Sequence, residues 1–321
     1  MHKLVSIIMP ICDNRYYFKN VIQAVLNQTY VNLEIIIVNT CLQHEDILNL
    51  PSDARLRVIK LSGAFPGRAR NAALEIARGE FIAFIDASTV PSQNWVADSL
   101  EIINSQNVAG VRGKGVAIAN TFQQKIIKAS SYGGDTFECL PGTVICKKVI
   151  SNAGFFINNV RSGEDLEWFQ RLRALEIKLH PLSHYVIEYH GLPVTFISAL
   201  KKWYRYSLSN AEVNILQSQK TAYLIILLSF FLYFAYSWNF VSTESAWDQS
   251  VYFVPNLNTY LWSLLLTLYF FYRAIFLPIK KNEKIFFILP FYWVFIGLLS
   301  LSLDIIKLPG KILSVIKILK N

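Results

Sequence analysis

The sequence has few of the residues that build metal centres and disulfide frameworks. It contains 4 cysteines in 321 residues. No pair has CxxC spacing, and no His/Cys cluster has the spacing of a zinc site. This excludes a disulfide scaffold or zinc ribbon and predicts reduced thiols in a cytosolic compartment. The four are Cys12, Cys41, Cys139 and Cys146.

Three other motifs are missing. No GxGxxG follows the first apolar run, which argues against a nicotinamide or flavin enzyme. No DNA- or RNA-binding motif accompanies the formal net charge of +9, so we expect no nucleic-acid partner. The apolar run Leu4–Ile11 is too short for a signal peptide and is soon followed by Asp13, so we expect the N-terminal half to stay in the cytoplasm.

The composition changes along the chain and predicts three parts. Residues 1–200 mix charged and apolar positions and are expected to form one soluble domain. Residues 201–220 are basic and aromatic, typical of a juxtamembrane segment, although a surface helix closing the domain fits equally well. Residues 221–321 are dominated by large apolar side chains, which makes membrane lipid the expected partner of the excess positive charge.

Three segments of the C-terminal part are candidate membrane spans. Each has about 20 residues, enough to cross the roughly 30 Å hydrocarbon core as a helix. Lysines lie between the second and third segments and none lies between the first and second, which predicts a multi-pass inner-membrane protein with a cytosolic N-terminal domain. The segments are Thr221–Val241, Leu257–Ile279 and Ile285–Ile306.

The third segment leaves two alternatives open. Four lysines follow it, and Pro290, Gly297 and Asp304 interrupt it. Either it spans fully and places those lysines outside, or it turns back or lies in the interface.

Residues 1–90 alternate apolar strand-like runs with helical patterns. Val5–Pro10, Leu33–Val38, Leu56–Leu61 and Phe81–Asp86 are short and rich in β-branched residues, whereas Phe18–Asn27 has helical spacing. Strands that alternate with helices predict a parallel, right-handed, doubly wound α/β sheet.

The most informative stretch is Gly79–Ser88. An apolar strand ends abruptly at Asp86, and the carboxyl edge of an open α/β sheet is where ligands bind. Just before it, a helix begins after Gly67 with Arg68 and Arg70 in its first turn. Together they suit a phosphorylated ligand and a metal ion, and an ordinary solvated helix–strand unit is the alternative.

These segments together resemble the family 2 glycosyltransferases, whose nucleotide-sugar-binding domain has the GT-A fold, a doubly wound mixed sheet. The resemblance covers about residues 4–206. It rests on Val5–Pro10, Gln28-Thr29-Tyr30, Leu33–Val38, Gly67-Arg68-Ala69-Arg70-Asn71, the strand ending at Asp86, and Gly163–Leu172.

The resemblance implies a role for each matching residue. Pro10 and Asn39 would flank the donor's base, and Asp86 would lie at the ribose and the metal ion, Mg²⁺ or Mn²⁺. Asp165 would be the base that deprotonates the acceptor hydroxyl, giving inversion at the sugar carbon. His190 matches a histidine that completes the metal shell in some members.

Structural alternatives stand beside these roles. Ser162-Gly163-Glu164-Asp165 also fits a capping box, in which Asp165 would cap the helix Leu166–Leu175. His190 fits a satisfied surface histidine, and Arg68 and Arg70 fit solvated helix charges.

Two positions depart from the family pattern. Asn39 replaces the usual aspartate at the end of the second strand, and an amide that can accept from uracil N3–H favours a pyrimidine donor. Ser88 stands where an acidic residue usually completes Asp-x-Asp, so metal affinity would depend on Asp86, the diphosphate and His190.

The sequence therefore predicts a membrane-anchored inverting glycosyltransferase. It would transfer a sugar from a nucleotide-diphosphate donor to a lipid-linked or polysaccharide acceptor. The alternative, motivated by Asn39 and Ser88, is a catalytically weak nucleotide-binding membrane scaffold of a polysaccharide assembly system.

Overall fold

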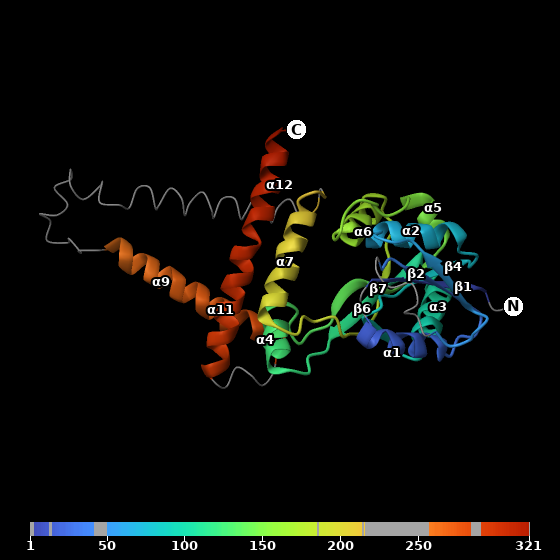
Figure 1. The fold of residues 1–321 in the computed structure, drawn as a ribbon, viewed down its shortest axis with the longest axis horizontal. Helices are drawn as coiled ribbons and strands as arrows, with labels where there is room; N and C mark the ends of the chain where they lie inside the picture. The colour runs from blue at the N-terminus through green and yellow to red at the C-terminus, as the bar shows by residue number, and fades with distance from the viewer. Residues whose placement is uncertain are drawn as a thin grey trace, which may run out of the picture.

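The computed structural model describes residues 3–12, 15–41, 50–184, 186–213, 215, 257–283 and 290–320. An α/β domain is joined on one side by a group of long helices (Figure 1). The predicted span Thr221–Val241 and the linker Ser242–Asn256 lie outside the described residues.

The strands form one sheet that begins as predicted. They are β1 (Val5–Ile11), β2 (Leu33–Asn39), β3 (Leu56–Lys60), β4 (Phe81–Phe84), β5 (Thr89–Pro91), β6 (Gly110–Ala117), β7 (Phe137–Cys146), β8 (His180–Pro181) and β9 (Ile187–Tyr189). The order is β3-β2-β1-β4-β7-β6-β9-β5, with β8 beside β6. β1 pairs in parallel with β2 and β4, and β2 pairs in parallel with β3.

Beyond β4 the sheet becomes mixed. β7 runs antiparallel to both β4 and β6, and β5 runs antiparallel to β9. The all-parallel arrangement predicted from the first 90 residues therefore holds for β1 to β4, and the mixed sheet of the GT-A fold is confirmed.

Helices cover both faces of the sheet, because its strands carry apolar side chains on both sides. The helices of the domain are α1 (Arg15–Leu26), α2 (Pro66–Ile76), α3 (Trp95–Gln106), α4 (Phe122–Ser131), α5 (Lys148–Ala153), α6 (Glu164–Ala174) and α7 (Phe196–Asn210). One core cluster joins α1 and α3 to one face, and a second joins α2, α5 and α6 to the other.

The C-terminal helices pack on the domain through α4 and α7. They are α9 (Leu257–Phe271), a π-helical turn (Tyr272–Phe276), α10 (Leu277–Lys280), α11 (Pro290–Ile306) and α12 (Leu308–Lys320). A third apolar cluster joins Ile127 of α4 and Ala199 of α7 to Ile296 and Leu303 of α11. In Figure 1, α12 runs beside α7 while α9 points away from the domain.

The turn after α10 docks on the α/β domain. The backbone N–H groups of Gly134 and Asp135 donate to the Lys281 carbonyl, and the Lys281 ammonium donates to the Ser131 carbonyl. Glu283 also pairs with Lys128 of α4. This lysine-bearing turn, predicted to be cytoplasmic, therefore lies on the same side as the domain.

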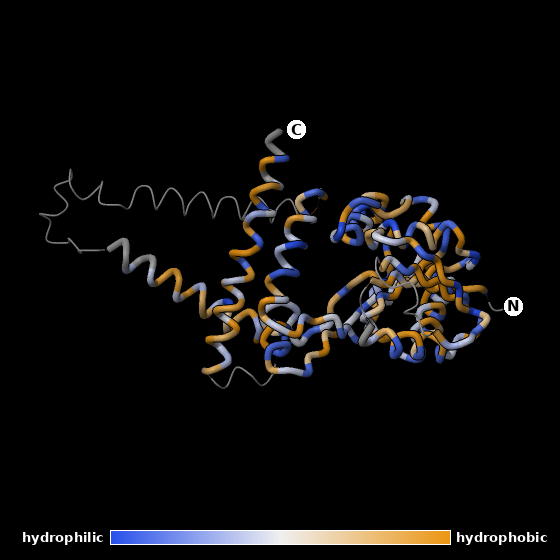
Figure 2. The backbone as a smooth tube through the Cα atoms, viewed as in Figure 1, coloured by the Kyte–Doolittle hydropathy of each residue, from blue (hydrophilic) through white to orange (hydrophobic). Residues whose placement is uncertain are grey.

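By length and composition, two helical stretches of the described chain are apolar enough to cross a membrane: Ser263–Lys280 and Phe291–Ser314. In the hydropathy colouring of Figure 2, orange bands alternate with white and blue ones along these helices. Their surroundings differ, because 11% of the first window is buried against 28% of the second.

Candidate active site

The carboxyl edge of the parallel strands opens into a pocket of about 770 Å³. Pro10 at the end of β1 lines it, together with Asp86 and Ser88, which follow β4. Asp165 in the first turn of α6 and Lys202 of α7 also line it. Residues separated widely in the sequence thus meet at the edge where open α/β sheets bind ligands.

Arg70 ties two sides of this pocket together. Its Nη1 donates to Glu164 Oε1 at 2.7 Å and its Nη2 donates to Asp86 Oδ1 at 2.9 Å. The Arg70 side chain is 5% exposed. Burial lowers the pKa of Arg70, but the charges of Asp86, Glu164 and Asp165 more than offset it and raise the pKa overall, so the guanidinium stays protonated. Arg70 is therefore a buried bridge between carboxylates, and its predicted contact with a phosphate stays a prediction.

Asp165 enters the pocket because of how α6 begins. Gly163 is the N-cap, with a φ of 92° that favours glycine. A Cβ at this position would lie 2.7 Å from Asn210 Oδ1 of α7, so a larger residue would not fit without a shift. No side chain caps this helix in the manner of a capping box. Asp165 Oδ1 accepts a hydrogen bond from the Leu166 N–H, so the residue supports the first turn while facing the pocket.

Both carboxyl groups at this helix start have raised pKa values. Burial raises the pKa of Asp165 and the charge of Asp86 adds to it, while Arg70 opposes the change. Burial likewise raises the pKa of Glu164 against the effect of Arg70. Glu164 Oε2 is buried and has no hydrogen-bond partner among the described residues. A carboxylate with a raised pKa at a pocket is suited to accept a proton.

His190 lies beside the Asp86–Ser88 segment but does not line the pocket. Its backbone N–H donates to the Ser88 carbonyl at 2.9 Å. Its ring stacks on Tyr17 at 4.6 Å, and its Nε2 lies 3.3 Å from Glu188 Oε2. Within the described residues, its Nδ1 is buried and has no hydrogen-bond partner.

Two other predicted residues also stand outside the pocket lining. Asn39 is buried, and its Oδ1 accepts from the Cys41 N–H at 3.0 Å, while its neighbour Thr40 lines the pocket. Arg68 is exposed on α2. Of the predicted site residues, the structure brings Pro10, Arg70, Asp86, Ser88 and Asp165 together and leaves Asn39, Arg68 and His190 apart.

Four charged residues that line the pocket were not predicted as site residues. Glu164 was part of a quoted motif, and its position directly before Asp165 was the available signal. Lys202 and Arg205 were assigned to a juxtamembrane segment, and only the packing of α7 over the strand ends places them at the pocket. Arg161 belongs to no motif that the sequence shows.

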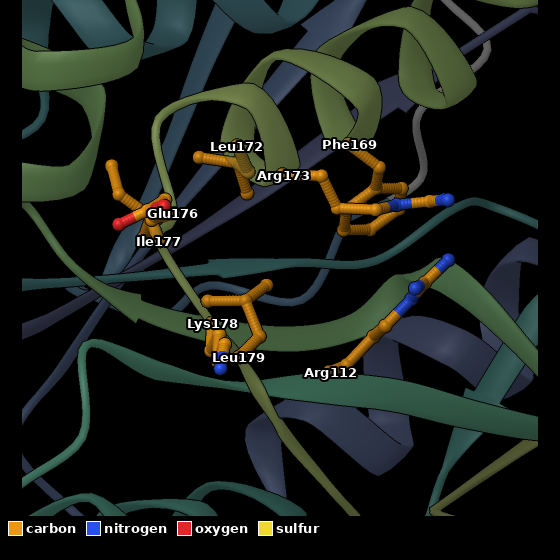
Figure 3. A pocket seen from close by; sticks show the side chains of 8 residues that line it. All are labelled: Arg112, Phe169, Leu172, Arg173, Glu176, Ile177, Lys178 and Leu179. Carbon is orange, nitrogen blue, oxygen red and sulfur yellow. The ribbon is translucent and has the colours of Figure 1, made fainter.

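A second pocket, of about 760 Å³, lies at the C-terminal end of α6 (Figure 3). The guanidinium of Arg112 lies 4.2 Å over the ring of Phe169, and Glu176 is the only acid among the described residues that line it. None of the predicted site residues lies there, so the first pocket is the candidate active site.

The mixed sheet, with carboxylates and cations meeting at its strand ends, is the fold of a GT-A domain. Residues 6–139 match the model of glycosyl transferase family 2.

Relatives with glycosyltransferase names match about a third of the chain. A putative teichuronic acid biosynthesis glycosyltransferase, TuaG of Bacillus subtilis, is 38% identical over 30% of this chain and 39% of its own length. WfaP of Escherichia coli, a UDP-Glc:alpha-D-GlcNAc-diphosphoundecaprenol beta-1,3-glucosyltransferase, is 32% identical over 33% of this chain and 43% of its own. The matches thus span less than half the length of these relatives.

Among solved structures, a mannosyltransferase of Pyrobaculum calidifontis, in complex with GDP-Man and Mn²⁺, aligns with 94% of this chain and 88% of its own. The identity is 12% and the TM-score is 0.48.

Proposed function

We propose that this chain is an inverting glycosyltransferase that takes a sugar from a nucleotide-diphosphate donor and transfers it to a lipid-linked or polysaccharide acceptor. The observation that carries the proposal is the meeting of Asp86 and Asp165 in one pocket of a family 2 domain. Asp165 is the proposed base and Asp86 the proposed anchor for the donor's diphosphate region.

The chain's own residues account for the proton transfer. Asp165 accepts the proton of the acceptor hydroxyl, and its raised pKa makes it a stronger base than an exposed aspartate. Arg70, held between Asp86 and Glu164, fixes the distance between the two ends of the pocket. Pro10 and Thr40 supply the wall for the nucleotide at the ends of β1 and β2.

A divalent cation fits this pocket only together with the donor. Within the described part of the chain, no group of three or more His, Cys, Asp or Glu side chains could hold a metal ion. Asp86 Oδ1 is engaged by Arg70, which leaves Oδ2 and the Ser88 hydroxyl as oxygen ligands. Mg²⁺ or Mn²⁺ bound by these oxygens and by the donor's phosphates would neutralise the leaving diphosphate.

The relatives favour a uridine donor and a lipid-linked acceptor. The printed name of WfaP gives UDP-Glc and a diphosphoundecaprenol acceptor for that protein. We carry both classes to this chain as part of the proposal.

We also propose that the protein resides in the inner membrane with the catalytic domain in the cytosol. The consecutive residues Leu264, Leu265 and Leu266 are each more than half exposed, as expected for a helix surrounded by lipid. Since the turn at Lys281 contacts the domain, the N-terminal domain and this turn share one side.

A donor screen tests the proposal. Purified full-length protein is incubated with UDP-Glc, UDP-GlcNAc or GDP-Man, with Mg²⁺, Mn²⁺ or a chelator, and nucleotide release is measured with and without membrane extract. We expect release with a uridine donor that needs the cation. Binding of the donor without any release would favour the scaffold alternative, and no binding of any donor would contradict both.

A further inference from the structure

The pocket has a basic side that the proposed proton transfer does not use. Lys202 and Arg205 of α7 line the same pocket as Asp86 and Asp165, and so does Arg161, which precedes α6. Ser162, next to Arg161, exchanges hydrogen bonds with Ser209 near the end of α7. The three cations are therefore carried by two elements that are fixed to each other.

Lys202 is held in place before any ligand binds. Its ammonium donates to the Tyr189 hydroxyl at 2.7 Å and to the Gly191 carbonyl at 3.2 Å. It also lies 5.4 to 5.7 Å from the ring centroids of Tyr189, Trp203 and Tyr206. An ammonium has three donors, so one donor remains for a ligand in the pocket.

These cations are not neutralised within the described part of the chain. None of Arg161, Lys202 and Arg205 forms an ion pair with a described acid, whereas Asp86 and Glu164 share Arg70. Three positive side chains around one space favour a multiply charged anion, and diphosphate is one.

The position of α7 indicates where that anion comes from. Figure 1 shows α7 between α12 and the sheet. The Ser207 hydroxyl of α7 donates to the Lys307 carbonyl at the junction of α11 and α12. The opposite face of α11 exposes an apolar stripe: Phe291, Val294, Leu298 and Ile305. A molecule that reaches the basic side past these helices has an apolar surface for a lipid chain and cations for its phosphates.

We propose that Lys202, Arg205 and Arg161 bind the diphosphate of a lipid-linked acceptor, whose hydrocarbon chain lies along α11 and α12. This inference rests on the proposed function, because it assigns the acceptor of the same pocket. The donor's own diphosphate has the same chemistry, and the proposal commits to the acceptor because α7 faces the apolar helices, whereas Pro10 and Thr40 form the wall at β1 and β2.

The test uses the full chain in detergent and three probes: farnesyl diphosphate, farnesol and UDP. The variants are Lys202→Met and Arg205→Met, which remove a charge and keep an apolar stem. The matched control is Lys201→Met, since Lys201 is exposed on the same helix and does not line the pocket. Dissociation constants are measured by titration calorimetry, and circular dichroism checks folding.

We expect wild-type protein to bind farnesyl diphosphate more tightly than farnesol. Each pocket variant should lower the affinity for farnesyl diphosphate by about tenfold or more, which is the effect of losing one hydrogen bond to a charged group. UDP affinity and the Lys201→Met control should stay near wild type, and Lys202→Arg should recover most of the loss. If Lys202→Met does not fold, the test is made with Arg205→Met, because Arg205 is exposed and its substitution should not affect folding.

Three results would overturn the inference. The first is equal affinity of the wild-type protein for farnesol and farnesyl diphosphate. The second is a pocket variant that loses affinity for UDP but keeps its affinity for farnesyl diphosphate. The third is a loss of farnesyl diphosphate affinity in Lys201→Met as large as in the pocket variants. Failure of the proposed function looks different, because UDP would then fail to bind wild-type protein whatever farnesyl diphosphate does.

Discussion

Arg70 shows how one side chain can define a site without touching the reacting atoms. Its guanidinium joins Asp86, after β4, to Glu164, at the start of α6, with bonds of 2.9 and 2.7 Å. Breaking a buried pair on one side leaves an uncompensated charge, which is strongly unfavourable. The distance between Asp86 and Asp165 therefore depends on Arg70.

The first residue-scale prediction concerns Asp165→Asn. We expect transfer to fall by roughly 10²- to 10⁴-fold, since a general base contributes about that much, while UDP affinity stays near wild type. Asn can still accept from the Leu166 N–H, so the helix start should be kept. Single-turnover assays and calorimetry measure the two effects. Asp98→Asn on α3 is the matched control, and wild-type turnover in Asp165→Asn would remove this residue from the mechanism.

The pH dependence follows from the same carboxyl group. Burial raises the pKa of Asp165 above its ordinary value of 3.8. The base acts when ionised, so activity should rise with pH through this raised value. We expect the acid limb of kcat/KM to have its midpoint above 3.8, and the residual activity of Asp165→Asn to lack that limb. A midpoint at or below the ordinary value would contradict this assignment.

Substitution of Ser88 is expected to strengthen metal binding, whereas most substitutions at a site weaken binding. It lines the pocket two positions after Asp86 and offers only a neutral hydroxyl. Ser88→Asp adds an ionised oxygen ligand, so Mn²⁺ should bind more tightly in the presence of UDP. Calorimetry measures this, with Ser105→Asp on α3 as the control. Unchanged or weaker affinity would mean that Ser88 does not face the cation.

At the scale of elements, α7 connects the apolar helices to the turn before Asp165, the proposed base. Ser209 and Asn210 at its end hold Ser162, three residues before Asp165. Ser207 in the same helix bonds the carbonyl of Lys307. These hydrogen bonds link α12, α7 and the turn before α6 in one series of contacts.

Gly310 of α12 tests this contact. A Cβ at Gly310 would meet the Ser207 hydroxyl and the Ser207 backbone of α7. Helix propensity alone favours alanine by about 1 kcal/mol, but the contact opposes it, so Gly310→Ala should lower Tm. Lys317→Ala, on the exposed side of the same helix, is expected to leave Tm unchanged or slightly higher. A Tm for Gly310→Ala at or above wild type would show that α12 does not pack closely on α7.

The local sequence pattern was enough to predict the strands whose side chains are almost all buried. The strand β2 lies where its β-branched run was recognised, and Asp86 follows β4 because the apolar run stops there. The antiparallel partner of β4 was beyond such patterns, since β7 is about 60 residues away and pairing across that distance leaves no local signal. Lys202 needed the packing of α7, because a basic–aromatic helix has the same pattern at a membrane surface and at a pocket.

At the scale of the molecule, α9 and α11 differ in what surrounds them. In α9, the successive residues Leu264, Leu265 and Leu266 are exposed, and the contact with α11 comes later in the helix, where the Tyr269 hydroxyl donates to Asp304. In α11, Ile296 and Leu303 are buried against the domain and only one stripe is exposed. In Figure 1, α11 and α12 run alongside α7, whereas α9 points outward. We therefore propose that α9 crosses the membrane and that α11 lies along its interface.

The contacts at the two ends of α11 strengthen this proposal. Phe291 and Tyr292, near its start, contact Phe122 at the start of α4. Lys307, just past its end, accepts a hydrogen bond from α7. A helix of 17 residues is about 25 Å long, so a crossing orientation would carry one end away from the α/β domain. Both ends contact that domain instead.

The last prediction follows from this arrangement and resolves the two alternatives for the third apolar segment. A reporter fused at the C-terminus should lie in the cytoplasm, because α12 packs on α7 of the domain that we propose to be cytosolic. A reporter between Lys280 and Lys284 should also be cytoplasmic, and an engineered cysteine at Ser250 should react with impermeant reagents from outside. An outside signal at the C-terminus would mean that α11 spans the membrane despite these contacts. Cytoplasmic labelling at Ser250 would instead reverse the orientation and separate the pocket from cytosolic nucleotide sugars.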